Sequence, residues 1–222
     1  MGSLKEEREA QLGQLLVVWK RRIDERLVKE QGLPASAFVA DGTLDPTAYW
    51  LAPAKRVLFV LREPNGERED DMRERVRKHR SPTWHGMVAL ARAILGEATL
   101  SGRTSQELGL EALGTAALIN AKKSKGGGAA NPLQLGGHLY GCADLLRRQI
   151  ELMEPAFVVF PRNPAGYAAL LGLPEEPTLS ADGHPVSAWK LPGRIYVGTH
   201  HPAARGGRAW VDAVGRVVAA LA

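Results

Sequence analysis

The stretch Arg56-Val-Leu-Phe-Val-Leu-Arg-Glu-Pro-Asn-Gly66 decides the fold class of this chain. Five apolar residues, 57–61, follow a charged one, and such a continuous apolar run is typical of a strand buried on both faces of a sheet. The polar turn 62–66, with its Pro and Gly, ends the strand. Three more short apolar runs follow along the chain and are predicted to be strands as well, at 115–120, 156–160 and 194–198.

Helical patterns alternate with these strands. Apolar residues recur every three or four positions in four longer segments, 3–29, 84–95, 139–153 and 208–221. Strands that alternate with helices predict an α/β protein, here a three-layer α/β/α sandwich around a central, mostly parallel four-stranded sheet. The 222 residues favour a single domain with a helical extension at about 1–50. We also expect a short helix at 165–171 and a minor strand at 187–191.

Composition and charge exclude several classes of protein. The chain is 45% hydrophobic and 24% charged, as in ordinary globular proteins, and no apolar run approaches the roughly 18 residues of a membrane span. Its start lacks the apolar core of a secretory signal, so we expect a cytoplasmic protein. Cys142 is the single cysteine, which excludes an internal disulfide and an iron–sulfur cluster held by four thiolates. The net charge of +5 fits a phosphate-rich partner as well as an ordinary basic surface.

Polar side chains follow each predicted strand of the sheet. Glu63 follows the first strand, Asn120 ends the second, Arg162 follows the third, and His200 and His201 follow the fourth. Carboxyl ends of parallel strands meet at one edge, so these groups are expected to converge on one crevice. Each has an ordinary alternative as well: a surface acid, an amide that satisfies the backbone, or a structural histidine. Adjacent histidines in a strand face opposite ways, so no metal site is predicted.

The order of four motifs resembles the uracil-DNA glycosylase superfamily. The motifs are Val60-Leu-Arg-Glu-Pro-Asn-Gly66, Pro82-Thr-Trp-His-Gly86, Leu118-Ile-Asn-Ala121 and Thr199-His-His-Pro-Ala-Ala204. The resemblance covers residues 56–222. The chain departs from the pattern in three ways: Leu61 or Arg62 replaces the glycine that opens the first motif, Asn65 replaces the aromatic residue or glycine after its proline, and the cluster cysteines of the bacterial branch are absent.

The resemblance implies a role for each motif. Glu63 falls on the catalytic acid, which orients water and opposes positive charge on the sugar, and His201 donates a hydrogen bond to the departing base. Asn120 reads the base and Trp84 stacks on it. The remaining implied contacts are base-binding by Arg62 and Asn65, and phosphate-binding by Lys122, Lys123, Lys125, Arg205 and Arg208.

The function implied by the resemblance is that of a monofunctional DNA N-glycosylase of base-excision repair. It would flip an altered base, uracil first, out of single- or double-stranded DNA and hydrolyse its N-glycosidic bond, as a monomer and without a cofactor or metal. Two alternatives stay open. One is a nucleic-acid-binding protein of the same fold with altered or lost chemistry. The other is an unrelated hydrolase or nucleotide-handling α/β protein that shares only the arrangement at the strand ends. The charged segment 67–80 is either a solvated helix or loop, or a further set of phosphate contacts.

Overall fold

The sheet in the computed structural model of the chain confirms the α/β class and enlarges the predicted sheet. The structure describes residues 2–30, 32, 37–64, 71–78, 81–97, 113–126, 132–161, 166–202 and 207–222. Within these residues one mixed sheet has seven strands in the order β1-β3-β2-β4-β7-β6-β5. The strands are β1 (Gly42–Thr43), β2 (Val57–Leu61), β3 (Ala116–Asn120), β4 (Phe157–Pro161), β5 (Leu179–Ser180), β6 (Ser187–Leu191) and β7 (Arg194–Thr199).

The four predicted strands form the parallel core of this sheet, β3-β2-β4-β7. The prediction of a four-stranded sheet was too small, because β1, β5 and β6 add antiparallel edges. Strands β1 and β5 have only two residues each and carry no apolar run, so a sequence pattern does not reveal them. Every residue of β2 and β3 is buried, as expected for strands covered on both faces.

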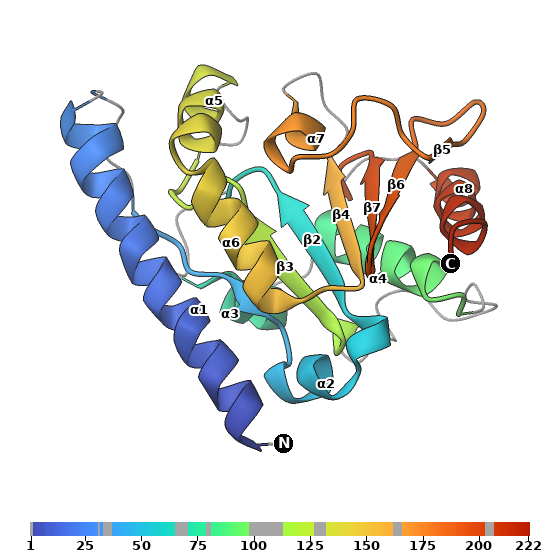
Figure 1. The fold of residues 1–222 in the computed structure, drawn as a ribbon, viewed down its shortest axis with the longest axis horizontal. Helices are drawn as coiled ribbons and strands as arrows, with labels where there is room; N and C mark the ends of the chain where they lie inside the picture. Colours follow the sequence, from blue (N-terminus) through green and yellow to red (C-terminus); the bar gives the residue numbers. More distant parts are fainter. Residues whose placement is uncertain are drawn as a thin grey trace.

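Helices flank both faces of the sheet, and Figure 1 shows α6 in front of the strands and α4 behind them. Two hydrophobic clusters fill the space between the layers. The front cluster lies between the sheet and α6, and the rear cluster lies between the sheet and helices α4 and α8. The helices are α1 (Gly2–Arg22), the π-helix η1 (Ile23–Glu30), α2 (Pro46–Leu51), the 3₁₀ turn η2 (Pro53–Lys55), α3 (Met72–Lys78), α4 (Pro82–Ile94), α5 (Pro132–Gly141), α6 (Ala143–Met153), α7 (Tyr167–Leu170) and α8 (Gly207–Ala219).

The N-terminal helix is part of the helical cover and packs along α6. Trp19 and Leu27, on α1 and η1, are wholly buried in the front cluster. The helical segment ends at Gly32, whose φ of 67° is the left-handed conformation that glycine adopts readily and whose N–H bonds to the Val28 carbonyl at 3.1 Å. The predicted extension is therefore bound into the fold by burial, since Val39, Leu44 and Tyr49 are buried in the core as well.

Part of the charged segment 67–80 is also helical. Helix α3 begins at Met72 and lies beside β1, and both Met72 and Val76 are buried in the rear cluster. The segment is therefore amphipathic over this turn, and its buried face attaches it to the core. Residues 65–70 and 79–80 lie outside the described residues.

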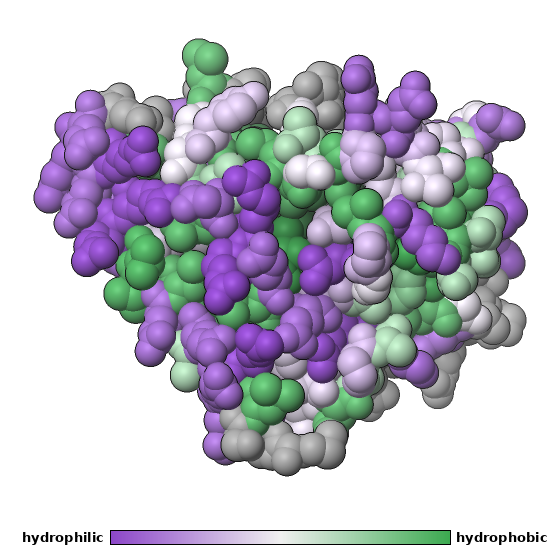
Figure 2. Space-filling view, in the orientation of Figure 1, coloured by the Kyte–Doolittle hydropathy of each residue, from purple (hydrophilic) through white to green (hydrophobic). Residues whose placement is uncertain are grey.

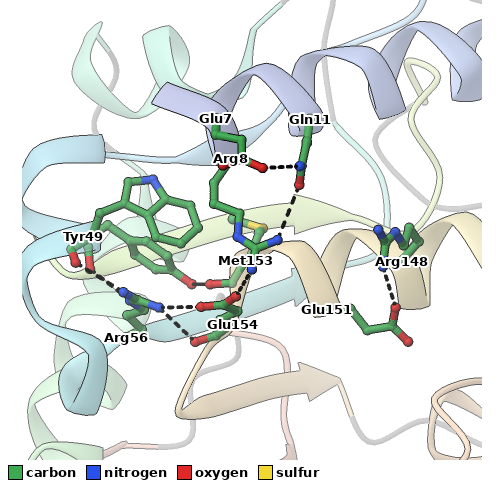
Figure 3. A network of polar contacts seen from close by, with 10 residues as sticks. Glu7, Arg8, Gln11, Tyr49, Arg56, Arg148, Glu151, Met153 and Glu154 are labelled. Carbon is green, nitrogen blue, oxygen red and sulfur yellow. Dashed lines mark hydrogen bonds and ion pairs between the residues drawn. The ribbon is translucent and has the colours of Figure 1, made fainter. Parts of the chain in front are cut away.

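Arg56, at the N-terminal end of β2, connects the sheet to the helices around it through hydrogen bonds and an ion pair (Figure 3). Its guanidinium donates to the Tyr49 and Trp50 carbonyls at 3.1 Å and forms an ion pair with Glu154 at 3.4 Å. Glu154 also pairs with Arg8 of α1. The network joins α1, α2 and the end of α6 at the edge opposite the polar strand ends.

Candidate functional site

The predicted polar groups lie at one edge of the parallel core, the upper edge in Figure 1. The register places Leu61 beside Asn120 and Pro161 beside Thr199, so the carboxyl ends of β2, β3, β4 and β7 are level. Glu63 follows β2 after one residue, and His201 follows β7 after one residue. These segments therefore follow the strands at one edge of the sheet. Arg162 lies outside the described residues.

Glu63 is a buried carboxylate held in an ion pair. Its side chain is 3% exposed, and Oε2 accepts a hydrogen bond from Lys122 Nζ at 2.7 Å. The Gly126 backbone lies directly against the carboxyl group, since a Cβ at that position would stand 2.3 Å from the carboxyl carbon. Oε1 has no hydrogen-bond partner among the residues that the structure describes. One oxygen of the carboxylate is thus fixed by Lys122, and the other is buried beside Gly126.

Backbone hydrogen bonds beyond the strand ends hold this arrangement. The Lys122 N–H donates to the Arg62 carbonyl at 2.9 Å, and the Gly126 N–H donates to the Pro64 carbonyl at 3.0 Å. The segment after β3 therefore runs beside the segment after β2. This pairing brings Lys122 and Gly126 to Glu63.

Asn120 is the least satisfied polar side chain at the site. The residue is 0% exposed, and its backbone N–H donates to Asp41 Oδ2 at 2.7 Å. Neither Oδ1 nor Nδ2 of its side chain has a hydrogen-bond partner within the described part of the chain. A buried polar group without a partner costs about 1–3 kcal/mol, so native proteins keep few of them without a reason. A ligand that carries a donor and an acceptor side by side would satisfy both atoms.

Asp41 and Lys123 form a second buried ion pair beneath the site. The two side chains are both 0% exposed, and Lys123 Nζ lies 2.6 Å from Asp41 Oδ2 and 4.4 Å from the centre of the Trp19 ring. Gln149 Nε2 also donates to Asp41, at 3.0 Å. Asp41 therefore receives the backbone of Asn120, an ammonium and an amide at once.

The structure corrects the phosphate-binding expectation for two lysines. Lys123 is enclosed by the core and paired with Asp41, so its ammonium is not presented to a phosphate. Lys122 is 4% exposed and bonds to Glu63 instead of facing solvent. The physical reason is that each lysine has a buried carboxylate to neutralise. Lys125 is half-buried and stays a predicted phosphate contact, as does Arg208, whose side chain is 79% exposed beside Asp212.

His201 is half-buried and uncharged at neutral pH. Burial, with a smaller effect of the Arg62 charge, lowers its pKa from 6.5 to about 4. A neutral imidazole keeps one N–H donor, and one ring nitrogen remains an acceptor. His200, its neighbour, is exposed and meets the edge of the Trp210 ring.

The turn that carries His201 rests on helix α4. A Cβ on Gly86 would stand 1.9 Å from the Pro202 carbonyl oxygen, so the two backbones are in direct contact. Trp84, one half-turn earlier, is half-buried, and its Nε1 is buried without a partner in the described residues. Ser81 caps this helix, because its hydroxyl accepts from the Trp84 N–H at 3.4 Å. Trp84 packs against the hydrophobic cluster on the α4 face of the sheet, and the contact with the His201 turn is made by Gly86. Asn65 and Arg205 lie outside the described residues.

Sequence reasoning missed Tyr167, which belongs to the same edge. Its ring stacks on Phe160 with centres 6.4 Å apart, and its hydroxyl is buried without a partner in the described chain. Burial raises the pKa of Tyr167 above its ordinary value, and the charges of Arg62 and Glu63 also act on it, which places it near them. The sequence feature that could have revealed Tyr167 is its position in the predicted short helix 165–171, which follows the third strand of the parallel core.

His138 of α5 is a buried histidine near Lys122, and its protonation makes the stability of the fold depend on pH. Its Nε2 lies 3.3 Å from the Ser124 hydroxyl. Burial, and then the charge of Lys122, lowers its pKa from 6.5 to about 4. The unfolded chain therefore binds a proton between these two pH values that the folded chain does not.

The folded protein is expected to lose stability as the pH falls from about 6.5 to 4, and to keep the full contribution above 6.5. The loss due to His138 approaches about 3 kcal/mol at pH 4. Urea unfolding of the wild type and of His138→Gln at pH 7 and pH 4.5 measures it. The variant should show the smaller change between the two pH values, and an equal change in both proteins would contradict the assignment.

The exposed apolar side chains of the described residues are scattered over the surface. Figure 2 shows hydrophilic residues over α1 with hydrophobic ones between them, and hydrophobic atoms that project above α5. The large apolar side chains most exposed are Val17, Leu133 and Tyr140, at 70%, 86% and 77%. Singly exposed apolar side chains are common on monomeric proteins, so we assign them no docking role.

The described residues contain no group of three His, Cys, Asp or Glu side chains placed to hold a metal ion. None of the helices in that part of the chain is long and apolar enough to cross a membrane. What the edge offers is a buried carboxylate, a neutral imidazole and an unsatisfied amide. A scan against models of known protein families and a search of curated proteins both gave no match to this chain.

Proposed function

We propose that this protein is a DNA glycosylase with a uracil-DNA glycosylase-like fold, which flips an altered base, uracil foremost, and breaks its N-glycosidic bond. The observation that carries the proposal is the Asn120 amide, wholly buried with both side-chain polar atoms unpartnered. It lies at the same sheet edge as the Glu63 carboxylate and the neutral His201. The motif order described above supports the same activity.

Asn120 suits the recognition of a base edge. Its amide carries a carbonyl acceptor and an N–H donor, which match N3–H and O4 of uracil. Unstacking the nucleotide costs a few kcal/mol, and less for a mispaired base. Stacking on Trp84 would offset this by roughly 1–3 kcal/mol. Hydrogen bonding to Asn120 alone does not select uracil, because the shape of the site also decides which base fits.

Glu63 and His201 suit the two charges that develop during bond breaking. The sugar becomes positive as the base leaves, in the manner of glycoside hydrolysis, and a carboxylate opposes that charge and orients the attacking nucleophile. The leaving base becomes negative, and the neutral His201 imidazole donates a hydrogen bond to its O2. The low pKa of His201 keeps it in this donor form at neutral pH.

The Lys122–Glu63 pair favours a second candidate function. An ammonium 2.7 Å from the carboxylate offsets the negative charge that the reaction needs. A protein of the same fold that binds nucleic acid without cutting the glycosidic bond would tolerate this pair. Binding would then be steeply salt-dependent, since phosphate contacts release counterions, while no base would be released.

Base release by the wild type distinguishes the two candidates, and the variants Glu63→Gln and His201→Ala test the mechanism. We expect both variants to bind a uracil-containing oligonucleotide as the wild type does and to release uracil about 10²–10³ times more slowly. The assay follows free uracil under single-turnover conditions, with binding measured in parallel. Glu176→Gln and His200→Ala are the controls, because both residues are exposed. Full activity in Glu63→Gln or His201→Ala would overturn the proposed mechanism.

A further inference from the structure

Lys122 is a primary amine placed inside the proposed catalytic site. It follows Asn120 by two residues, its side chain is 5% exposed, and its Nζ lies 2.7 Å from Glu63 Oε2. Lysine is rarely buried unless it is paired, and here the partner is the carboxylate that acts on the sugar. An ordinary surface salt bridge does not require a lysine to be buried in this way.

The charge of this ion pair conflicts with simple hydrolysis. A fixed ammonium beside the sugar would repel the positive charge that builds there, and it would weaken the effect of Glu63. Lys123, the next residue, already has its own buried partner, Asp41, so it does not explain the placement of Lys122. The conflict disappears if the amine gives its proton to Glu63 and reacts.

We propose that Lys122 is the nucleophile of a covalent step, so that the protein is a glycosylase with an associated abasic-site lyase activity. This inference rests on the proposed function. Desolvated lysines form Schiff bases with aldehyde-level carbons, and an adjacent base activates them. Glu63 Oε2 already accepts the Lys122 N–H, which is the geometry that this proton transfer needs.

The reaction passes through a protonated imine between Lys122 and the sugar. Lys122 gives one proton to Glu63, its nitrogen bonds to C1′, and the C1′–N bond to the base breaks with the electron pair leaving on the base. The nitrogen then gives a second proton to the base anion, and the ring C1′–O4′ bond opens as O4′ takes the proton held by Glu63, which leaves a protonated imine at C1′ and restores the carboxylate. Glu63 takes a proton from C2′, and the electron pair expels the 3′ phosphate and cuts the strand. Water finally hydrolyses the imine and frees Lys122.

Borohydride trapping tests the inference directly, because hydride reduces the imine to a stable amine. The wild-type protein is incubated with a labelled uracil oligonucleotide, and separately with an oligonucleotide that carries a preformed abasic site, each with sodium borohydride. We expect a covalent protein–DNA complex on a denaturing gel with both probes. Mass spectrometry of the digested complex should place the adduct on Lys122.

Two variants complete the experiment. Lys122→Arg keeps a cation beside Glu63 but cannot form an imine, and we expect at least a tenfold loss of the trapped complex. Lys55→Arg is the control, since Lys55 is exposed at the opposite edge of the sheet, and it should trap as the wild type does. The mapped wild-type adduct decides the case even if Lys122→Arg fails to fold.

The outcomes separate this inference from the proposed function. Release of uracil without an adduct, or an adduct on another lysine, would overturn the role of Lys122 and leave the glycosylase activity standing. An adduct on Lys122 with the abasic probe, but no uracil release, would support the imine chemistry and overturn the base excision. Neither release nor adduct would overturn both.

Discussion

Replacing Gly86 with alanine is expected to destabilise the protein and to remove most of its base release. The new Cβ would stand 1.9 Å from the carbonyl oxygen of Pro202 and 2.7 Å from its carbonyl carbon. Both are backbone atoms, so no side chain can rotate away, and α4 must separate from the turn that carries His201. Overpacking of this kind costs about 1–3 kcal/mol, and occasionally more.

The loss of activity should exceed the loss of stability in this variant. His201 precedes Pro202 directly, and a misplacement of about 1 Å in a catalytic group can cost about 10²-fold in rate. Urea unfolding and single-turnover uracil release measure the two effects. Gly13→Ala is the control, because Gly13 lies in α1 with nothing within 4 Å of a new Cβ, and there alanine should be neutral or stabilising. A Gly86→Ala protein with wild-type stability and rate would contradict the contact.

Replacing Asp41 with alanine is expected to cost about 3–5 kcal/mol of unfolding free energy, since it leaves the buried Lys123 ammonium without a counter-charge. The two side chains are 0% exposed, and Asp41 also accepts from Gln149 and from the backbone of Asn120. The variant should therefore loosen the end of β3 as well. Equilibrium urea unfolding gives the loss.

A double-mutant cycle checks the cause of that loss. Lys123→Met alone leaves a buried carboxylate and should also destabilise, whereas the double variant Asp41→Ala with Lys123→Met removes both charges and should recover part of the stability. Additive losses in the double variant would show that the two side chains do not depend on each other.

The parallel core was predictable because its strands are short apolar runs. Each of the four runs became a strand of the core, and the polar residues after them fell at one edge, as strand geometry requires. The long predicted helix at 139–153 became two, with the break at Cys142, because the same apolar spacing continues across the break. Pattern alone does not register such an interruption.

The buried polar partners were not predictable in the same way. Asp41 bonds to Lys123 82 residues later, and Glu63 bonds to Lys122 59 residues later. The first pair therefore needs β1 beside β3, and the second needs β2 beside β3. In the sequence, Lys122 and Lys123 form part of a basic run that resembles a solvent-exposed loop. Their burial follows from tertiary structure, which supplies a carboxylate for each.

Base release by the wild-type protein is the direct test of the proposed glycosylase activity. Labelled oligonucleotides that carry uracil, hypoxanthine, xanthine or a mismatched thymine, single- and double-stranded, are incubated with the protein and then treated with alkali. We expect cleavage at one altered base, uracil foremost, which is lost in Glu63→Gln and His201→Ala. Salt-sensitive binding without cleavage of any oligonucleotide would contradict it, and would leave a nucleic-acid-binding protein in its place.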